Sequence, residues 1–148
     1  MALRSLGALD QRSLDFCCEI NKWCKKFTLQ NHPPKHFFDD ITIRDPATTP
    51  PCDLYVAGFP CQPFSRAGLR HGANDAKGRG SIFEHINLYL RAHRPRAVIL
   101  ENVAGLQDKV FGDTFSEMLA ALRGIEGNGD QPYSVSYTHL TLPTILRV

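Results

Sequence analysis

Short apolar segments and amphipathic segments alternate along the chain. Four apolar runs have the length of buried strands, and three segments carry apolar residues at helical spacing. The expected strands lie within residues 14–20, 35–43, 53–59 and 96–103, the expected helices within 21–31, 81–93 and 114–124, and a fifth strand is expected to begin within 133–137. This alternation predicts an α/β fold with a parallel, doubly wound sheet.

Residues that begin or end helices support these boundaries. Asn21 is the expected N-cap of the first helix, which Pro33 and Pro34 end. Pro95 follows the second helix and Gly124 ends the third. Two long connections, residues 44–52 and 60–80, are rich in proline, threonine or glycine and are expected to be loops.

Composition narrows the class of protein. The 148 residues include 17 Lys and Arg against 15 Asp and Glu, so the formal net charge is only +2. Apolar residues make up 43% and charged residues 22% of the chain, which is typical of a globular domain or a piece of one and excludes a disordered chain. No apolar run approaches the ~20 residues of a membrane helix, so no membrane partner is expected.

The cysteines and histidines argue against a disulfide scaffold and against a metal site. Five cysteines are an odd number and show no CxxC spacing, and the six histidines form no HExxH or HxH pair. We therefore expect reduced thiols, no bound metal and an intracellular protein, nuclear if its source is eukaryotic.

Chemically reactive residues gather at the predicted strand ends. Glu19 and Glu101 close two strands, Asp40 lies within or after another, and Cys61 follows a third. Ligands of open α/β sheets bind beyond the carboxyl ends of the strands, so three acids and a thiol are expected to line one cleft.

Cys61 stands in the most informative string of the chain, GFPCQPFS at residues 58–65. Pro60 and Pro63 stiffen its loop, and Gly58 permits a close turn. A rigid loop that presents one thiol suits a nucleophile, although a buried cysteine acting as a small apolar side chain fits the local composition too.

Three blocks in order carry a family resemblance: GFPCQPFS, then GRGSIF at residues 78–83, then ILENVAGL at residues 99–106. Together they resemble the DNA cytosine-5 methyltransferase family. The resemblance implies a Rossmann-like, S-adenosylmethionine-dependent methyltransferase sheet. It also implies transfer of a methyl group from S-adenosylmethionine to carbon 5 of a cytosine flipped out of duplex DNA, through a covalent cysteine adduct.

The resemblance assigns roles around the base. Cys61 matches the nucleophile that adds to carbon 6, and Glu101 matches the carboxylate that holds ring nitrogen 3 and the exocyclic amine. Asn102 matches the residue that fixes the loop around this acid; a turn-forming asparagine is the local alternative. The positions matched to substrate binding are Gln62, Ser65 and Arg79. For the last of these, a solvated loop arginine remains an alternative.

The resemblance also implies a cofactor site. Glu19 matches the acid that holds the cofactor ribose, and Asp40 matches the acid that meets the adenine amine. An ordinary strand-end acid and a loop acid are the alternatives for these two. Apolar walls of the site are implied at Ile20, Ile41, Pro60 and Ile82.

Two parts of the family pattern have no counterpart in the chain. The glycine-rich block DLFxGxGG, expected before the CEI of residues 18–20, is missing from MALRSLGALDQRS, and no QxRxR block or recognition domain follows YSVSY. We therefore expect a truncated catalytic domain at residues 1–137 and an unrelated or artefactual tail at residues 138–148. Because the first strand is central in the family's sheet, its absence leaves two inner strand edges unpaired.

Three other functions are alternatives to a DNA cytosine-5 methyltransferase. A tRNA cytosine-5 methyltransferase shares the chemistry, but GFPCQPFS favours the DNA enzymes. A non-catalytic remnant of the DNA enzyme would keep Cys61 and Glu101 without holding cofactor. A cysteine hydrolase that pairs Cys61 with His71 or His85 has no further sequence signature.

Overall fold

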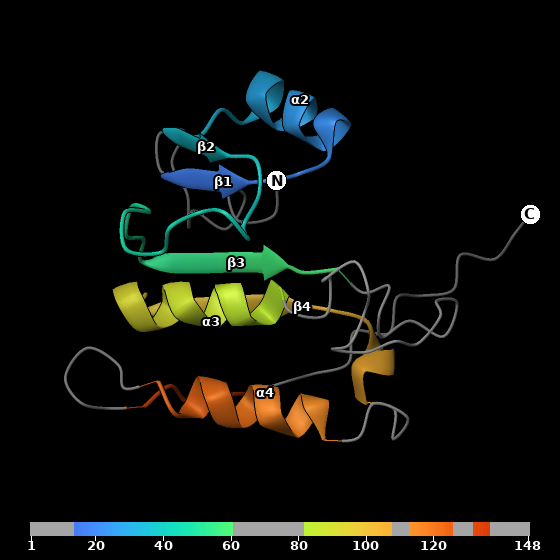
Figure 1. The fold of residues 1–148 in the computed structure, drawn as a ribbon, viewed down its shortest axis with the longest axis vertical. Coiled ribbons are helices and arrows are strands. Elements are labelled where there is room, and N and C mark those ends of the chain that lie inside the picture. Colours follow the sequence, from blue (N-terminus) through green and yellow to red (C-terminus); the bar gives the residue numbers. More distant parts are fainter. Residues whose placement is uncertain (1–13, 61–81, 108–112, 126–131, 137–148) are drawn as a thin grey trace, which may run out of the picture.

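The computed structural model describes residues 14–60, 82–107, 113–125 and 132–136 (Figure 1). The elements are β1 (Phe16–Cys18), α2 (Lys22–Asn31), β2 (His36–Phe38), β3 (Leu54–Gly58), α3 (Ile82–His93), β4 (Ala97–Glu101), the short 3-10 helix η3 (Ala104–Gln107) and α4 (Thr114–Arg123). Strands and helices alternate, so the predicted α/β class is confirmed. Among the described residues, no helix is long and apolar enough to cross a membrane.

The four strands form two parallel pairs. In the first, β1 pairs with β2 from Phe16 opposite His36 to Cys18 opposite Phe38. In the second, β3 pairs with β4 over five residues and ends with Gly58 opposite Glu101. The predicted parallel pairing is therefore present, but in two separate two-stranded sheets within the described part of the chain.

Two of the expected strands are shorter than predicted or missing. The run at residues 35–43 ends as a strand at Phe38, because the Asp40 carboxylate accepts hydrogen bonds from the backbone and hydroxyl of Thr42 and turns the chain. The fifth strand expected to begin within residues 133–137 is not found at the described residues 133–136; only Pro132, just before them, forms an isolated β-bridge. There Tyr133 instead donates its hydroxyl to the carbonyl of Pro95 over 2.5 Å.

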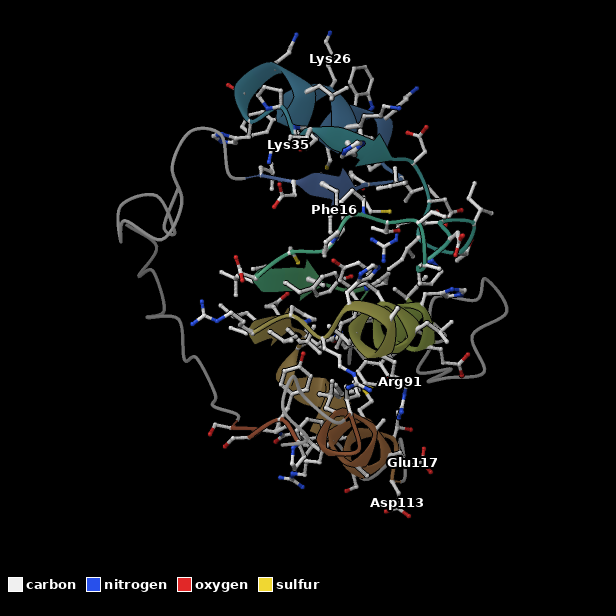
Figure 2. All side chains as sticks on the ribbon, turned by 90° about the vertical axis from the view of Figure 1, so that its left-hand side faces the viewer. Phe16, Lys26, Lys35, Arg91, Asp113 and Glu117 are labelled. Carbon is white, nitrogen blue, oxygen red and sulfur yellow. The ribbon has the colours of Figure 1, made fainter. Side chains whose placement is uncertain are left out.

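Aromatic side chains join the two sheets. β1 and β3 point the same way and face each other (Figure 1), with no described strand between them. Phe16 extends from β1 toward β3 (Figure 2). Its ring centroid lies 6.2 Å from that of Tyr55 on β3 and 5.3 Å from that of Tyr89 on α3. Packing of rings thus takes the place of backbone hydrogen bonds at this junction.

Arg44 is buried at the same junction, with 6% of its surface exposed. Its guanidinium lies 5.2 Å from the ring centroids of Phe16 and Tyr89 and 5.9 Å from that of Phe38. Its Nε and Nη2 atoms are buried and have no hydrogen-bond partner among the described residues. Buried donors without hydrogen-bond partners lower the stability of a fold. Among the described residues, only the contacts of the guanidinium with the aromatic rings offset that cost at these two atoms.

The main core lies between the β3–β4 sheet and the helices α3 and α4. The predicted stripe of the second helix is confirmed, because α3 buries Phe83, Ile86, Tyr89 and Leu90. The Tyr89 hydroxyl donates to the carbonyl of Pro50 over 2.8 Å, which ties the loop before β3 to α3. Strand alternation turns Val56 and Ile99 to the other face, where they are 52% and 48% exposed.

Candidate functional site

The end of the β3–β4 sheet holds Glu101, the last residue of β4. Its side chain is exposed, and its register partner across the sheet is Gly58. A Cβ atom built on Gly58 would lie 3.2 Å from Glu101 Oε2, so the carboxylate lies directly over the Gly58 backbone. Gly58 is the last residue of the extended strand β3, which lies within the strand predicted at residues 53–59.

Asn102 connects the same two strand ends. Its Nδ2 atom donates to the backbone carbonyl of Phe59 over 3.2 Å, and its Oδ1 atom accepts from the backbone N–H of Val103 over 2.9 Å. Both bonds are partly buried. They fix the backbone after Glu101 to the backbone that leads through the half-buried Pro60 toward Cys61.

The positions expected at the centre of the catalytic loop lie outside the described residues. These are Cys61, Gln62, Ser65 and Arg79. The described part of the site therefore consists of the strand ends on which that loop begins and of the acid opposite it.

Glu19 lies at the carboxyl end of β1. Its backbone N–H donates to the carbonyl of Phe38 over 3.1 Å and continues the β1–β2 ladder by one residue. Its Oε1 atom accepts from the backbone N–H of Asn21 over 2.7 Å. Asn21 in turn caps α2, as predicted, because its Oδ1 atom accepts from the N–H groups of Trp23 and Cys24.

The expected apolar positions differ in their burial. Ile20 follows Glu19 and is 76% exposed. Ile41 and Ile82 are half-buried and pack against the core. Pro60 is half-buried as well, so only one of the four positions is exposed.

Asp40 lies directly after β2 and is held in its turn by Thr42. The hydrogen bonds from the Thr42 backbone and hydroxyl, each 2.8 Å long, lower the pKa of the Asp40 carboxyl, and the charge of His85 lowers it further. Asp40 is therefore ionised at neutral pH.

Comparison with known proteins gives the family. The model of the C-5 cytosine-specific DNA methylase family matches residues 8–141. The chain belongs to the C-5 cytosine-specific DNA methylase family.

Several type II methyltransferases are similar to the chain. M.NlaX of Neisseria lactamica is 40% identical over 116 residues, which cover 78% of the chain and 36% of that protein. M.NgoBI of Neisseria gonorrhoeae is 39% identical over 73% of the chain and 33% of that protein. M1.ScrFI of Lactococcus lactis subsp. cremoris is 37% identical over 75% of the chain and 28% of that protein. The chain thus spans about a third of the length of these relatives.

The structure gathers the described site residues of this methylase chain into two groups. Gly58, Pro60, Glu101 and Asn102 surround the end of the β3–β4 sheet, and Glu19, Ile20 and Asp40 surround the end of the β1–β2 sheet. Both sheets end on the same side of the molecule (Figure 1). This is the side on which ligands of parallel α/β sheets bind.

Sequence reasoning missed two residues of these groups. His85 was considered only as a partner for Cys61, whereas its charge lowers the pKa of Asp40. Gly58 was predicted within a strand and as permitting a close turn, but its contact with Glu101 was not predicted. The available signal for Gly58 was a glycine inside an otherwise apolar strand run, which often marks a close approach by another group.

Three of the four described cysteines are poor nucleophiles. Cys17, Cys18, Cys24 and Cys52 are free thiols, and Cys24 is exposed. Burial raises the pKa of Cys17 and Cys52, and it raises the pKa of Cys18 to about 11. These three thiols are therefore protonated at neutral pH, whereas nucleophilic attack requires the thiolate.

Proposed function

We propose that the protein acts as a DNA cytosine-5 methyltransferase in which Cys61 attacks a flipped cytosine and Glu101 holds that base. The observation that carries the proposal is the hydrogen bond from Asn102 to the carbonyl of Phe59. It ties the residue after Glu101 to the backbone two positions before Cys61. The family membership of the chain supports the same reaction.

The chemistry follows from the two side chains. The Cys61 thiolate adds to carbon 6 of cytosine, and the electron pair of the 5,6 double bond moves to carbon 5. Glu101 donates a hydrogen bond or a proton at nitrogen 3, which disperses the charge that develops on the ring. S-adenosylmethionine supplies the methyl group that carbon 5 takes up. A base then removes the proton from carbon 5, and the Cys61 thiolate leaves as the double bond forms again.

The described residues fit that cofactor. The ionised Asp40 accepts hydrogen bonds, as an adenine amine requires, and Glu19 presents a carboxylate for ribose hydroxyls. The exposed Ile20 offers an apolar surface beside both acids, which suits one face of adenine. Ile41, Pro60 and Ile82 would complete the apolar wall, and Gln62, Ser65 and Arg79 would contact the DNA strand or the flipped nucleotide.

We further propose that the two sheets are parts of one Rossmann-like sheet that is completed by a strand between β1 and β3. Three observations support this: both pairs are parallel, their strands point the same way, and two buried nitrogens of Arg44 at the junction lack acceptors among the described residues. Backbone carbonyls of an inserted strand would supply such acceptors. On this proposal, residues 1–137 are part of a longer catalytic domain; the family model matches as far as residue 141, so an unrelated tail would begin after that residue rather than at 138.

Trapping tests the reaction. Duplex DNA of random sequence, with 5-fluorocytosine in place of cytosine, is incubated with the 148-residue chain and saturating S-adenosylmethionine. Because fluorine on carbon 5 cannot leave as a proton does, we expect a stable protein–DNA adduct in denaturing gels. Cys61→Ser should abolish the adduct, and Cys24→Ser, which changes an exposed thiol, should not.

Two other outcomes contradict the proposal. Folded chain that forms no adduct with either nucleic acid would favour a non-catalytic remnant of the DNA enzyme. Adduct formation on a 5-fluorocytosine tRNA transcript, with none on DNA, would favour the related tRNA enzymes.

A further inference from the structure

The contact between Gly58 and Glu101 lies on one face of the β3–β4 sheet. The two residues are register partners at the end of a parallel ladder, and their side-chain positions lie on the same face of the sheet. A methyl group on Gly58 would meet Glu101 Oε2 at 3.2 Å, which is closer than an ordinary contact between carbon and oxygen. The carboxylate therefore occupies the space that a side chain at position 58 would take.

Among the residues that the structure describes around Gly58, nothing else calls for glycine at this position. Gly58 is an exposed residue of an extended strand, where a glycine is less favourable than alanine by about 0.5–1 kcal/mol. One register pair earlier on the same face, Val56 lies opposite Ile99, so this face accommodates branched side chains. The distinguishing feature at position 58 is the carboxylate opposite it.

We propose that Gly58 is a positioning residue, whose lack of a side chain lets the Glu101 carboxylate lie over β3, beside the backbone that leads to Cys61. This inference rests on the proposed function of Glu101. With a side chain at position 58, the carboxylate has to move away from β3 and lose its alignment with a base held at Cys61.

The proposal separates the effect on activity from the effect on folding. The atom that has to move is the far end of an exposed, flexible side chain, so Gly58→Ala leaves the fold intact and does not lower the thermal midpoint. Activity responds differently, because displacement of a catalytic group by about 1 Å can lower a rate by as much as a hundredfold. We expect Gly58→Ala to slow adduct formation on 5-fluorocytosine DNA by about tenfold.

A matched control is available at Gly124. A Cβ there would lie 3.3 Å from the carbonyl oxygen of Ala120, a similarly close contact, but at the end of α4. Gly124→Ala therefore tests the effect of an added methyl group away from Glu101. We expect it to leave the rate of adduct formation unchanged within about twofold.

The double-mutant cycle with Glu101→Ala shows whether Gly58 acts through Glu101. If it does, Gly58→Ala should slow adduct formation in the wild-type background and change it by less than about twofold in the Glu101→Ala background. Equal slowing in both backgrounds, or a wild-type rate in Gly58→Ala, would overturn the inference.

A second measurement is independent of activity. The carboxyl carbon of Glu101, observed by NMR in protein labelled with ¹³C at glutamate and assigned with Glu101→Gln, should change its chemical shift in Gly58→Ala and not in Gly124→Ala. An unchanged resonance in Gly58→Ala overturns the positioning role. If the resonance moves but wild-type protein forms no adduct, the proposed function fails while the contact stands.

Discussion

Asn102 donates a hydrogen bond from its side-chain amide to the backbone carbonyl of Phe59, across 43 positions of sequence. The same side chain accepts a hydrogen bond from the N–H of Val103. One amide thus fixes both the residue after Glu101 and the backbone that enters the Cys61 loop.

Replacement of Asn102 tests this connection. Asn102→Asp keeps an acceptor for Val103 but replaces the donor to Phe59 by a carboxylate oxygen, which faces the Phe59 carbonyl and repels it. We expect at least about 1 kcal/mol of lost stability in chemical unfolding. We also expect a drop in the rate of 5-fluorocytosine trapping of about tenfold or more, because the strand ends lose their alignment. Unchanged trapping in a destabilised variant would show that the bond is structural only.

Replacement of Arg44 by methionine, unlike that of Asn102 by aspartate, is not expected to lower stability. Two of the buried nitrogens of Arg44 lack hydrogen-bond partners among the described residues, so an apolar side chain of similar length removes the cost of burying these donors. Arg44→Met should leave the free energy of unfolding unchanged or raise it by about 1 kcal/mol. Arg44→Ala, which also removes the contacts with Phe16 and Tyr89, should lower it. A large loss in Arg44→Met, measured by urea unfolding, would mean that the two nitrogens are hydrogen-bonded.

Tyr89 tests the connection between α3 and the loop before β3. Its hydroxyl donates to the carbonyl of Pro50, and its ring stacks on Tyr55 with the centroids 4.8 Å apart. Tyr89→Phe removes the hydrogen bond and keeps the stack, so we expect a loss of about 1 kcal/mol in urea unfolding. Tyr89→Ala should cost about 3–5 kcal/mol, since it also empties a buried site. Equal losses of unfolding free energy in Tyr89→Phe and Tyr89→Ala would show that the ring of Tyr89 contributes nothing beyond its hydroxyl.

The buried thiols predict a loss of stability at alkaline pH. Burial raises the pKa of Cys18 from 9.0 to about 11, so the folded state keeps the proton that the unfolded state releases. This contribution is complete below pH 9 and is lost as the pH rises from 9 to 11. Thermal midpoints measured across this window should fall less steeply in Cys18→Ala than in the wild-type chain. The exposed Cys24→Ala is the control, and the two variants should differ.

Local signals in the sequence predicted the helices well. The apolar stripe of α3 and the cap at Asn21 depend on residues a few positions apart, so pattern and capping chemistry suffice to find them. The strands were harder to delimit. The side chain of Asp40 ends β2 by accepting hydrogen bonds from Thr42, and periodicity alone does not anticipate that competition with the ladder.

The arrangement of the site depends on contacts between distant segments. Glu101 and Asn102 could be singled out by their motif, but the carboxylate over Gly58 and the amide bond to Phe59 depend on the register of β3 against β4. The burial of Arg44 also depends on contacts between distant segments. The sequence predicts a polar loop at this position, and the burial of the side chain follows from the positions of the three aromatic rings around it.

In the part of the chain that the structure describes, side-chain contacts centred on Phe16 and Arg44 hold the β1–β2 half of the molecule against the rest. A junction that rests on side-chain packing lacks the cooperativity of a continuous ladder of backbone hydrogen bonds. We therefore expect this junction to open before either half of the molecule unfolds. Amide hydrogens of β1 and β2 would then exchange with solvent sooner than those of β3 and β4. Since Glu19 and Asp40 lie on one side of this junction and Glu101 on the other, its opening would separate the residues to which we assign the cofactor from the residue to which we assign the base.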